Sequence, residues 1–418
     1  MTSQPGNSTT TRQEAPALRR SLTLWQVVLY GLGTTVGAGI YLLIGEVART
    51  TGTAAPAAFL LSSVLAGLTA LSFGELVARY PQSAGEAAYV REGLGSKGYA
   101  RVVGLLVATA GSVSAAVMTR GFVGYLATFV APPEFVCIVL FVAALVAVSI
   151  WGVGESVTLA GVLTLVEVGG LVVVIAAASD HLPDIPGRAA ELLAIGNPAV
   201  WPGVAMAALL AFYAFLGFED MVNVAEEVRD ARHTLPKGIV ITLVLTTVLY
   251  LLLSALSVLA VSPDDLAQSK APLALVYERA SGGSAKTIAW VGVLAVVNGA
   301  LIQLIMASRV IYGLASRGQL PAVFARVHGR TQTPHVATAT VGTVVFLLAV
   351  AFPLGPLAEG TSVVTLIVFA SVNAALWRIK GQGKGAAVAF EIPRWIPLLG
   401  AISTSSLLLY RLWNLVVG

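Results

Sequence analysis

Long apolar runs, separated by short polar segments, follow one another along almost the whole chain. Eleven of them are read as membrane-spanning helices, because about 20 apolar residues cross the hydrocarbon core of a bilayer. The expected spans are residues 24–48, 56–78, 101–130, 135–152, 156–178, 201–228, 238–261, 287–316, 336–352, 362–379 and 396–417. The pattern predicts an all-α polytopic membrane protein with about eleven transmembrane helices.

The first run is interrupted in its middle by glycine. Residues 30–41 read YGLGTTVGAGIY, and each glycine inside a helix costs about 0.5–1 kcal/mol relative to alanine. An unwound helix at this depth frees N–H and C=O groups, which a membrane tolerates only where the backbone lines a cavity or meets a ligand. Two interpretations stay open: a ligand site made of backbone, or close packing of a neighbouring helix against small residues.

The sixth run contains an acidic pair within apolar sequence. Glu219 and Asp220 follow Gly217 closely, and an ionised carboxylate at the centre of a span costs at least about 2.5–3.5 kcal/mol. Either the carboxylates face a cavity at a break, or the span ends at Gly217 and Glu219 lies in water. The apolar stripe of residues 221–228 favours a second half-helix. Interrupted segments five spans apart are typical of inverted-repeat transporters, whose site lies at the two breaks.

Composition limits the chemistry that the chain can perform. It is 57% hydrophobic and 11% charged, against about 45–50% and 25% in soluble domains. One cysteine and four histidines without paired spacing make a disulfide or a metal site unexpected. We find no nucleophile constellation and no phosphate-binding loop, and the net charge of +4 requires no nucleic-acid partner. We therefore expect no enzyme activity, no cofactor and no metal.

The basic residues predict the orientation in the membrane. With the N-terminus inside, 18 of the 25 lysines and arginines fall on the cytoplasmic side, as the positive-inside rule requires. We expect a multi-pass protein of the cytoplasmic (inner) membrane with a cytoplasmic N-terminus. An odd number of spans places the C-terminus outside, and one additional helix would place it inside.

Four stretches resemble the amino acid/polyamine/organocation (APC) transporter superfamily. They are FGELVARYPQSAGEAAYV at 73–90, AEEVRD with TLPKGI at 225–239, SRVIYGLASRGQLP at 308–321, and TPHVA at 333–337. The resemblance covers nearly the whole chain and implies a LeuT-like 5+5 inverted repeat with broken helices 1 and 6. It divides the chain into a cytoplasmic tail (1–21), a first five-helix repeat (22–180), an extracellular loop (181–200), a second repeat (201–380), and a cytoplasmic loop with an additional C-terminal helix (381–418).

The resemblance also implies a substrate site at the two breaks. The N–H groups at the start of the second half of span 1 suit a carboxylate, because a helix N-terminus carries positive partial charge; these belong to Gly37, Ala38 and Gly39. Free carbonyls suited to an ammonium group would come from Thr35, Tyr213, Ala214 and Leu216. The expected lining residues are Thr34, Ala38, Phe212, Tyr213, Asn298 and Ser371. Tyr213 matches the position of an aromatic gate in the family.

Span 5 departs from that family. Many proton-coupled members have a lysine in mid-helix, where this sequence has Glu167. An acidic group in an apolar span usually has a function, so Glu167 is the expected coupling residue. It could carry a proton, hold a cation or pair with Arg120 on span 3. The alternative is a glutamate displaced towards the cytoplasmic end of the span.

The sequence therefore predicts a permease that moves an amino acid by alternating access, either coupled to protons or exchanging substrates. An amine or polyamine permease is the nearest alternative. A non-transporting membrane sensor is the alternative from another class, although both tails are short for one. The expected partners are the amino acid, protons and the lipid bilayer, and the sequence leaves the oligomeric state open.

Overall fold

The computed structural model describes residues 22–81, 85–130, 132–151, 157–383 and 388–417, and the expected N-terminal tail lies outside them. Its helices are α1 (Leu24–Val36), α2 (Ala38–Thr51), α3 (Ala55–Arg79), α4 (Gly85–Leu94), α5 (Lys97–Leu126), α6 (Glu134–Trp151), α7 (Val157–Ala177), α8 (Asp184–Leu192), α9 (Trp201–Phe215), α10 (Ala231–Ala260), α11 (Pro263–Gln268), α12 (Pro272–Ser281), α13 (Ala285–Ser316), α14 (His335–Ala351), α15 (Leu354–Gly381) and α16 (Trp395–Val417). Short 3-10 helices are η1 (Gly52–Ala54), η2 (Ser179–His181), η3 (Pro198–Val200), η4 (Phe218–Glu227) and η5 (Ala322–Ala325).

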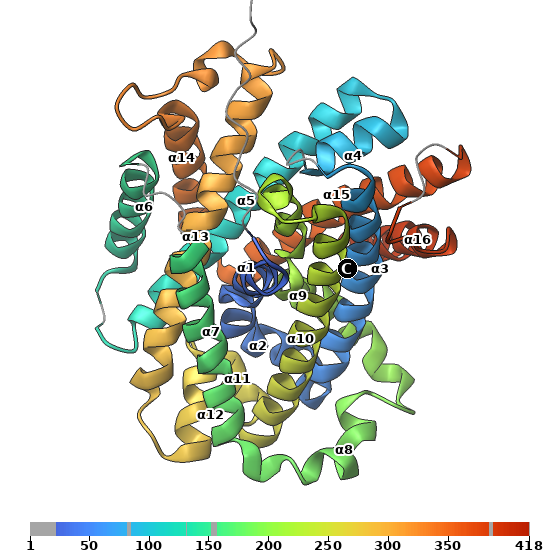
Figure 1. Ribbon diagram of the computed structural model, residues 1–418. Coiled ribbons are helices and arrows are strands. Elements are labelled where there is room, and N and C mark those ends of the chain that lie inside the picture. The colour runs from blue at the N-terminus through green and yellow to red at the C-terminus, as the bar shows by residue number, and fades with distance from the viewer. Residues whose placement is uncertain (1–21, 82–84, 131, 152–156, 384–387, 418) are drawn as a thin grey trace, which may run out of the picture.

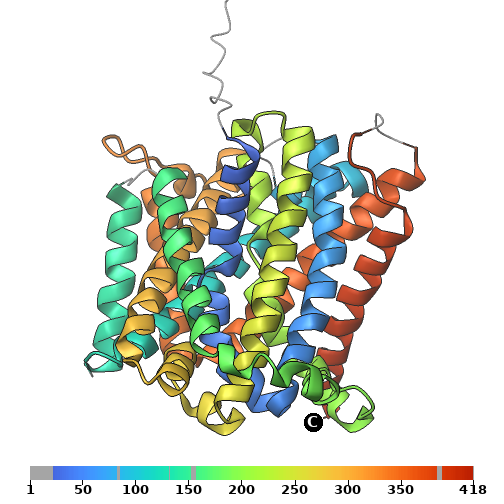
Figure 2. The ribbon, with the colours of Figure 1, turned by 60° about the horizontal axis from the view of Figure 1, so that its bottom comes forward.

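The helices form one bundle whose long members run between two faces (Figures 1 and 2). Among the described residues, eight helical stretches are long and apolar enough to cross a membrane, and three further apolar helices are shorter. One of the shorter ones is α1, which is the first half of a broken span. The all-α, multi-pass architecture expected from the apolar runs is thereby confirmed.

Both expected interruptions are present. Span 1 divides into α1 and α2 at Gly37, whose φ of −39° and ψ of −136° end the helix. Span 6 ends as an α-helix at Phe215; Leu216 is extended, and Gly217 adopts a φ of +123°. Beyond Gly217 the chain continues as the 3-10 helix η4 and not as the expected second α-helical half. A reason is local: the Gly217 N–H binds the Glu219 carboxylate at 2.8 Å, and the Asp220 N–H binds the Gly217 carbonyl at 3.1 Å, in the tighter 3-10 pattern.

The two breaks pack directly on each other at the centre of the bundle. A Cβ atom on Gly39 would lie 2.6 Å from the Ala214 Cα, and one on Gly217 would lie 2.2 Å from the Thr34 carbonyl oxygen. The Thr34 hydroxyl donates to the Gly217 carbonyl at 2.9 Å. The glycines at the breaks therefore allow the close approach of two backbones, which was the alternative interpretation of the pattern in span 1.

Helix α10 fixes this crossing from one side. The Tyr250 hydroxyl lies 3.0 Å from the Thr35 carbonyl and 2.9 Å from the Ala214 carbonyl. One buried side chain thus bridges the last turns of α1 and α9, and it satisfies carbonyls that helix ends leave without a partner.

The other long helices surround the crossing. Helix α5 packs along both α13 and α15, whereas α3 packs along α10 and α9, and α16 lies against α15 and α3. Figure 2 shows α4 on the face where the chain enters α1, and α8, α11 and α12 on the opposite face. We call the first the N-terminal face.

A buried ionic cluster joins α3 to α15 at the N-terminal face. Glu75, with no exposed surface, binds Arg79 at 2.6 Å and Lys380 at 2.8 Å, and accepts the Ile392 N–H at 2.9 Å. The hydrogen bond from Ile392 holds the segment that precedes α16 against the bundle. Removal of one partner would leave a buried charge unpaired, which is strongly destabilising.

Candidate substrate site

A central cavity lies against the break of span 6. Leu216, Glu219 and Asp220 form one wall, and α5, α13, α15 and the start of α4 form the others. Its polar lining residues, apart from these two acids, are Glu86, Ser114, Gln303, Thr361 and Thr365. Thr361, Thr365 and the apolar Phe369 follow one another at helical spacing, so α15 turns a single face to the cavity.

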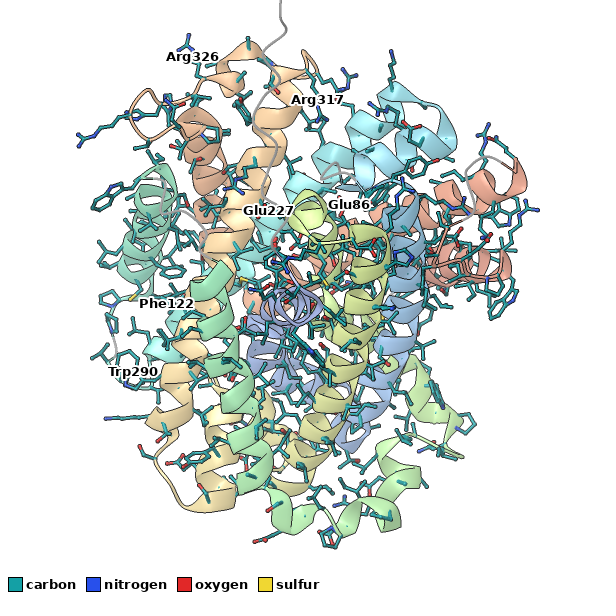
Figure 3. The ribbon with its side chains drawn as sticks, viewed as in Figure 1. Glu86, Phe122, Glu227, Trp290, Arg317 and Arg326 are labelled. Atoms are coloured by element: carbon teal, nitrogen blue, oxygen red, sulfur yellow. The ribbon has the colours of Figure 1, made fainter. Side chains whose placement is uncertain are left out.

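A wider second cavity continues from the first towards the N-terminal face. The two share Glu86, Val107, Asp220 and Met306, and the outer cavity reaches Arg309 and Arg317 on α13. Figure 3 shows Glu86 in the N-terminal half of the bundle and Arg317 at its outer edge. The central cavity is therefore adjacent to an outer cavity on this face.

Packed aromatic side chains occupy the region on the other side of the crossing. The Tyr125 hydroxyl donates to the Tyr41 carbonyl at 2.7 Å, and a Cβ atom on Gly292 would lie 2.4 Å from the Tyr125 ring. A third cavity lies beyond them, near the opposite face, and it is lined by Glu46, Arg120, Glu134 and Lys270. It shares no lining residue with the central cavity, so the two cavities on the N-terminal face lie apart from it.

Of the residues expected to bind substrate, Leu216 lines the central cavity. The others whose side chains are described lie buried or half-buried in the crossing behind the cavity wall: Thr34, Thr35, Gly37, Gly39, Phe212, Tyr213 and Ala214. Ala38 begins α2. Three of the four carbonyls expected to bind an ammonium group already accept hydrogen bonds: those of Thr35 and Ala214 from Tyr250, and that of Tyr213 from the Leu216 N–H.

Tyr213 is joined to the cavity wall through Ser114. Its hydroxyl lies 2.9 Å from the Ser114 Oγ, and the side chain is 3% exposed. Phe215, two residues later, points elsewhere and packs edge-on against Tyr250, with ring centroids 5.1 Å apart. The two aromatic residues therefore have different surroundings.

Glu86 and Phe369 are among the lining residues that were not recognised from the sequence. Glu86 lies in the stretch that carries the family resemblance, but nothing local indicated that α4 would reach a central cavity. Phe369 packs against Phe73, Phe212 and Phe218 from three other elements, with centroids 5.4–5.8 Å apart. Its helical spacing from Thr361 and Thr365 was the only local signal for this cavity-facing side of α15.

Glu167 is fully buried beside the break of span 1. Its Oε1 accepts a hydrogen bond from the Asn298 amide of α13 at 3.1 Å, whereas Oε2 has no partner in the described part of the chain. The Tyr41 hydroxyl, from the second half of span 1, donates to the Glu167 carbonyl at 2.6 Å. One turn earlier on α7, Thr164 lies against Gly33 of α1. The carboxyl group therefore stands level with the end of α1.

The expected alternative partner of Glu167 is engaged elsewhere. Arg120 pairs with Glu134 and donates to the Ala349 carbonyl. This ion pair lines the third cavity, so the sequence-based pairing of Arg120 with Glu167 is wrong. Within the described residues, no three His, Cys, Asp or Glu side chains are close enough together to hold a metal ion.

Comparison with known proteins identifies the family of this bundle. The amino acid permease family matches residues 22–416. An uncharacterized transporter of Mycobacterium tuberculosis is 32% identical over 389 residues, which cover 92% of this chain and 84% of the relative. The branched-chain amino acid permease BcaP of Bacillus subtilis is 26% identical, covering 90% of this chain and 84% of the relative. The vacuolar cationic amino acid transporter 4 of Arabidopsis thaliana is 29% identical, covering 85% and 62%. The chain is therefore a transporter that belongs to the amino acid permease family of the APC superfamily.

Proposed function

We propose that this transporter moves an amino acid across the cytoplasmic membrane by alternating access, with the N-terminal face in the cytoplasm. The observation that carries the proposal is the polar central cavity against the break of span 6, which shares lining residues with an outer cavity on the N-terminal face. In that arrangement the substrate reaches the site from the cytoplasm. The reverse state would open the region packed around Tyr41 and Tyr125.

The α-carboxylate and α-ammonium groups are assigned to the backbone of the two breaks. The start of α2, from Gly37 to Gly39, supplies N–H groups and positive partial charge for the carboxylate. The carbonyl of Leu216, a residue of the cavity wall, is assigned to the ammonium group. Because Gly39 and Ala214 pack together here, the substrate has to separate α2 from α9 locally, and this separation links binding to the change of state.

Glu167 is assigned to the coupling of transport to protons. An isolated carboxyl group buried in the membrane is neutral or paired, and such groups relay protons in transporters. The Oε2 atom of Glu167, which has no partner among the described residues, lies level with the end of α1. A proton gained or lost there would change the contacts of the broken span.

An amine or polyamine permease is the second candidate, and the three carboxyl groups in the central cavity favour it. The two candidates differ in whether the ligand needs a carboxylate. Melting temperatures of the purified protein, measured with each of the twenty amino acids and with common amines, distinguish them.

A true substrate at about 100 times its Kd should stabilise the folded state by about 2.7 kcal/mol. We expect at least one amino acid to raise the melting temperature, and its decarboxylated analogue to have no effect. Equal shifts with the analogue would favour the amine permease. No shift with any amino acid, from protein that melts cooperatively, would contradict the proposed substrate.

Tyr213 and Phe215 should differ when each is replaced by alanine. Tyr213→Ala removes the hydrogen bond to Ser114 at the cavity wall and should lower uptake per folded molecule by tenfold or more, in the range of about 1–3 kcal/mol of lost interaction. Phe215→Ala empties packed space next to Tyr250 and should act mainly on stability, by about 3–5 kcal/mol. Equal uptake defects, after correction for the amount of folded protein, would remove this distinction.

A further inference from the structure

Three residues with carboxyl groups line the central cavity. Glu86 comes from α4, and Glu219 and Asp220 come from η4, whereas none of the described residues that line this cavity is a lysine or arginine. Carboxylates in such a low-dielectric site require a proton or a cation nearby, because an unpaired buried charge costs several kcal/mol. Arg309 and Arg317 line the outer cavity, which Glu86 and Asp220 also line.

Among these three acids, Glu86 is the one best placed to bind a ligand. It is 7% exposed, it lines both cavities, and its carboxyl group accepts a hydrogen bond from its own backbone N–H. The two other acids have neighbours within the protein. Glu219 accepts the Gly217 N–H at 2.8 Å, and Asp220 faces the Gln303 amide at 3.5 Å. Glu86 is thus a buried acid, at the junction of the cavities, for which no described side chain is a donor.

The arrangement of these acids favours an organic cation over a metal ion. No three acidic, histidine or cysteine side chains among the described residues come close enough to hold one metal ion. A guanidinium or ammonium group on a flexible chain can instead reach Glu86, which lines both the central and the outer cavity. Val107, Ala110, Met306 and Phe369 supply the apolar wall on which the methylene groups of such a chain would pack.

We propose that the central cavity binds the cationic side chain of a lysine- or arginine-like amino acid, with Glu86 as its anionic partner. This inference rests on the proposed amino acid transport and deepens it, because it names the substrate class. The α-groups stay at the breaks near Leu216, and the side chain extends towards the N-terminal face. The named relatives include transporters of cationic and of branched-chain amino acids, so their names leave the class open and the charge of the cavity decides it.

The affinity of the cavity for a cationic side chain should depend on pH. Burial raises the pKa of the Glu86 carboxyl group from 4.5 to about 7, so the group is neutral below that pH and anionic above it. Arginine remains a cation throughout. The charged and titratable groups that face Glu86 are Glu219 and Asp220 on η4, Tyr30 on α1, Tyr89 on α4, and Arg309 and Arg317 on α13. Arginine should therefore bind more tightly as the pH rises from about 6 to about 8, whereas a neutral side chain should bind equally.

The test compares arginine with citrulline, which has nearly the same shape without the charge, by calorimetric Kd on the purified full-length protein. Lysine and norleucine form a second such pair. Arginine should bind at least about tenfold more tightly than citrulline, since charge-assisted hydrogen bonds are roughly twice as strong as neutral ones. Glu86→Gln should reduce this ratio to near one, chiefly by weakening the binding of arginine. Glu92→Gln removes the same charge from an exposed position on the same helix and should keep the wild-type ratio.

Each outcome decides the inference. Equal binding of arginine and citrulline by the wild-type protein overturns it, and so does a ratio that survives in Glu86→Gln. A cooperative melting transition of Glu86→Gln serves as the control for folding of the variant. If leucine or another neutral amino acid binds and arginine does not, amino acid transport stands and the cationic class is wrong. If no amino acid binds, the proposed function itself fails.

Discussion

Glu167→Gln should retain substrate binding and lose accumulation driven by a pH gradient. The amide keeps the size of the side chain and can still accept the hydrogen bond from Asn298, but it cannot release a proton. Proteoliposomes loaded at one pH and diluted into another should concentrate substrate with the wild-type protein. With Glu167→Gln they should show only exchange or downhill flux, a loss of tenfold or more in accumulation, which corresponds to about 1.4 kcal/mol of coupling.

A matched control is Glu134→Gln, which makes the same charge change at a half-exposed glutamate that pairs with Arg120 near the third cavity. It should accumulate substrate like the wild type. Unchanged accumulation by Glu167→Gln would contradict the proton-carrier role. Accumulation that depends on a sodium gradient in the wild type would instead assign Glu167 to cation binding.

Gly217→Ala should prevent formation of a stable protein. Gly217 has a φ of +123°, which residues other than glycine rarely adopt. A Cβ atom there would lie 2.2 Å from the Thr34 carbonyl oxygen. Strained backbone costs about 1–3 kcal/mol and overpacking of a core costs about as much again, so we expect a loss of roughly 2–6 kcal/mol. The measurement is the melting temperature in detergent together with the yield of monodisperse protein.

Gly169→Ala is the control for this substitution. Gly169 lies inside α7, and a Cβ atom there would meet no atom within 4 Å. Alanine favours the helix by about 1 kcal/mol, so the melting temperature should stay the same or rise. A Gly217→Ala protein that melts at the wild-type temperature would show that the two breaks do not need the close contact that the structure places between them.

Much of this architecture could be predicted because a membrane makes certain residues costly. Glycines at 37 and 39, and the acids at 219 and 220, stand out only against apolar surroundings, and the structure has breaks at 37 and 216–217. Glu167 stood out for the same reason, and it is buried, as the apolar surroundings indicated. In each case the residue is energetically unfavourable in an apolar membrane span, and this can be read from the sequence of that span alone.

The walls of the central cavity could not be predicted in this way, since they depend on contacts between distant segments. Glu86 is on a short helix outside the spans, and its burial depends on α5, α15 and η4 around it. Nothing in the sequence around Ser114 distinguishes it from other small polar residues, because its hydrogen bond to Tyr213 arises only in the folded protein. The 3-10 form of η4 depends on how the Glu219 side chain folds back onto Gly217, and helical periodicity alone does not distinguish that from an α-helix.

The central claim, that an amino acid occupies the cavity beside the break of span 6, is tested most directly by substrate protection of a cysteine placed there. Thr365 lines this cavity, and the only native cysteine, Cys137, can be replaced by serine. Thr365→Cys should react with a water-soluble thiol reagent, and an amino acid that raises the melting temperature should slow the reaction with a half-maximal concentration equal to its Kd. Ser269→Cys, in the third cavity, should react at the same rate with and without it. Unchanged labelling of Thr365→Cys at saturating amino acid would place the substrate elsewhere and contradict the account.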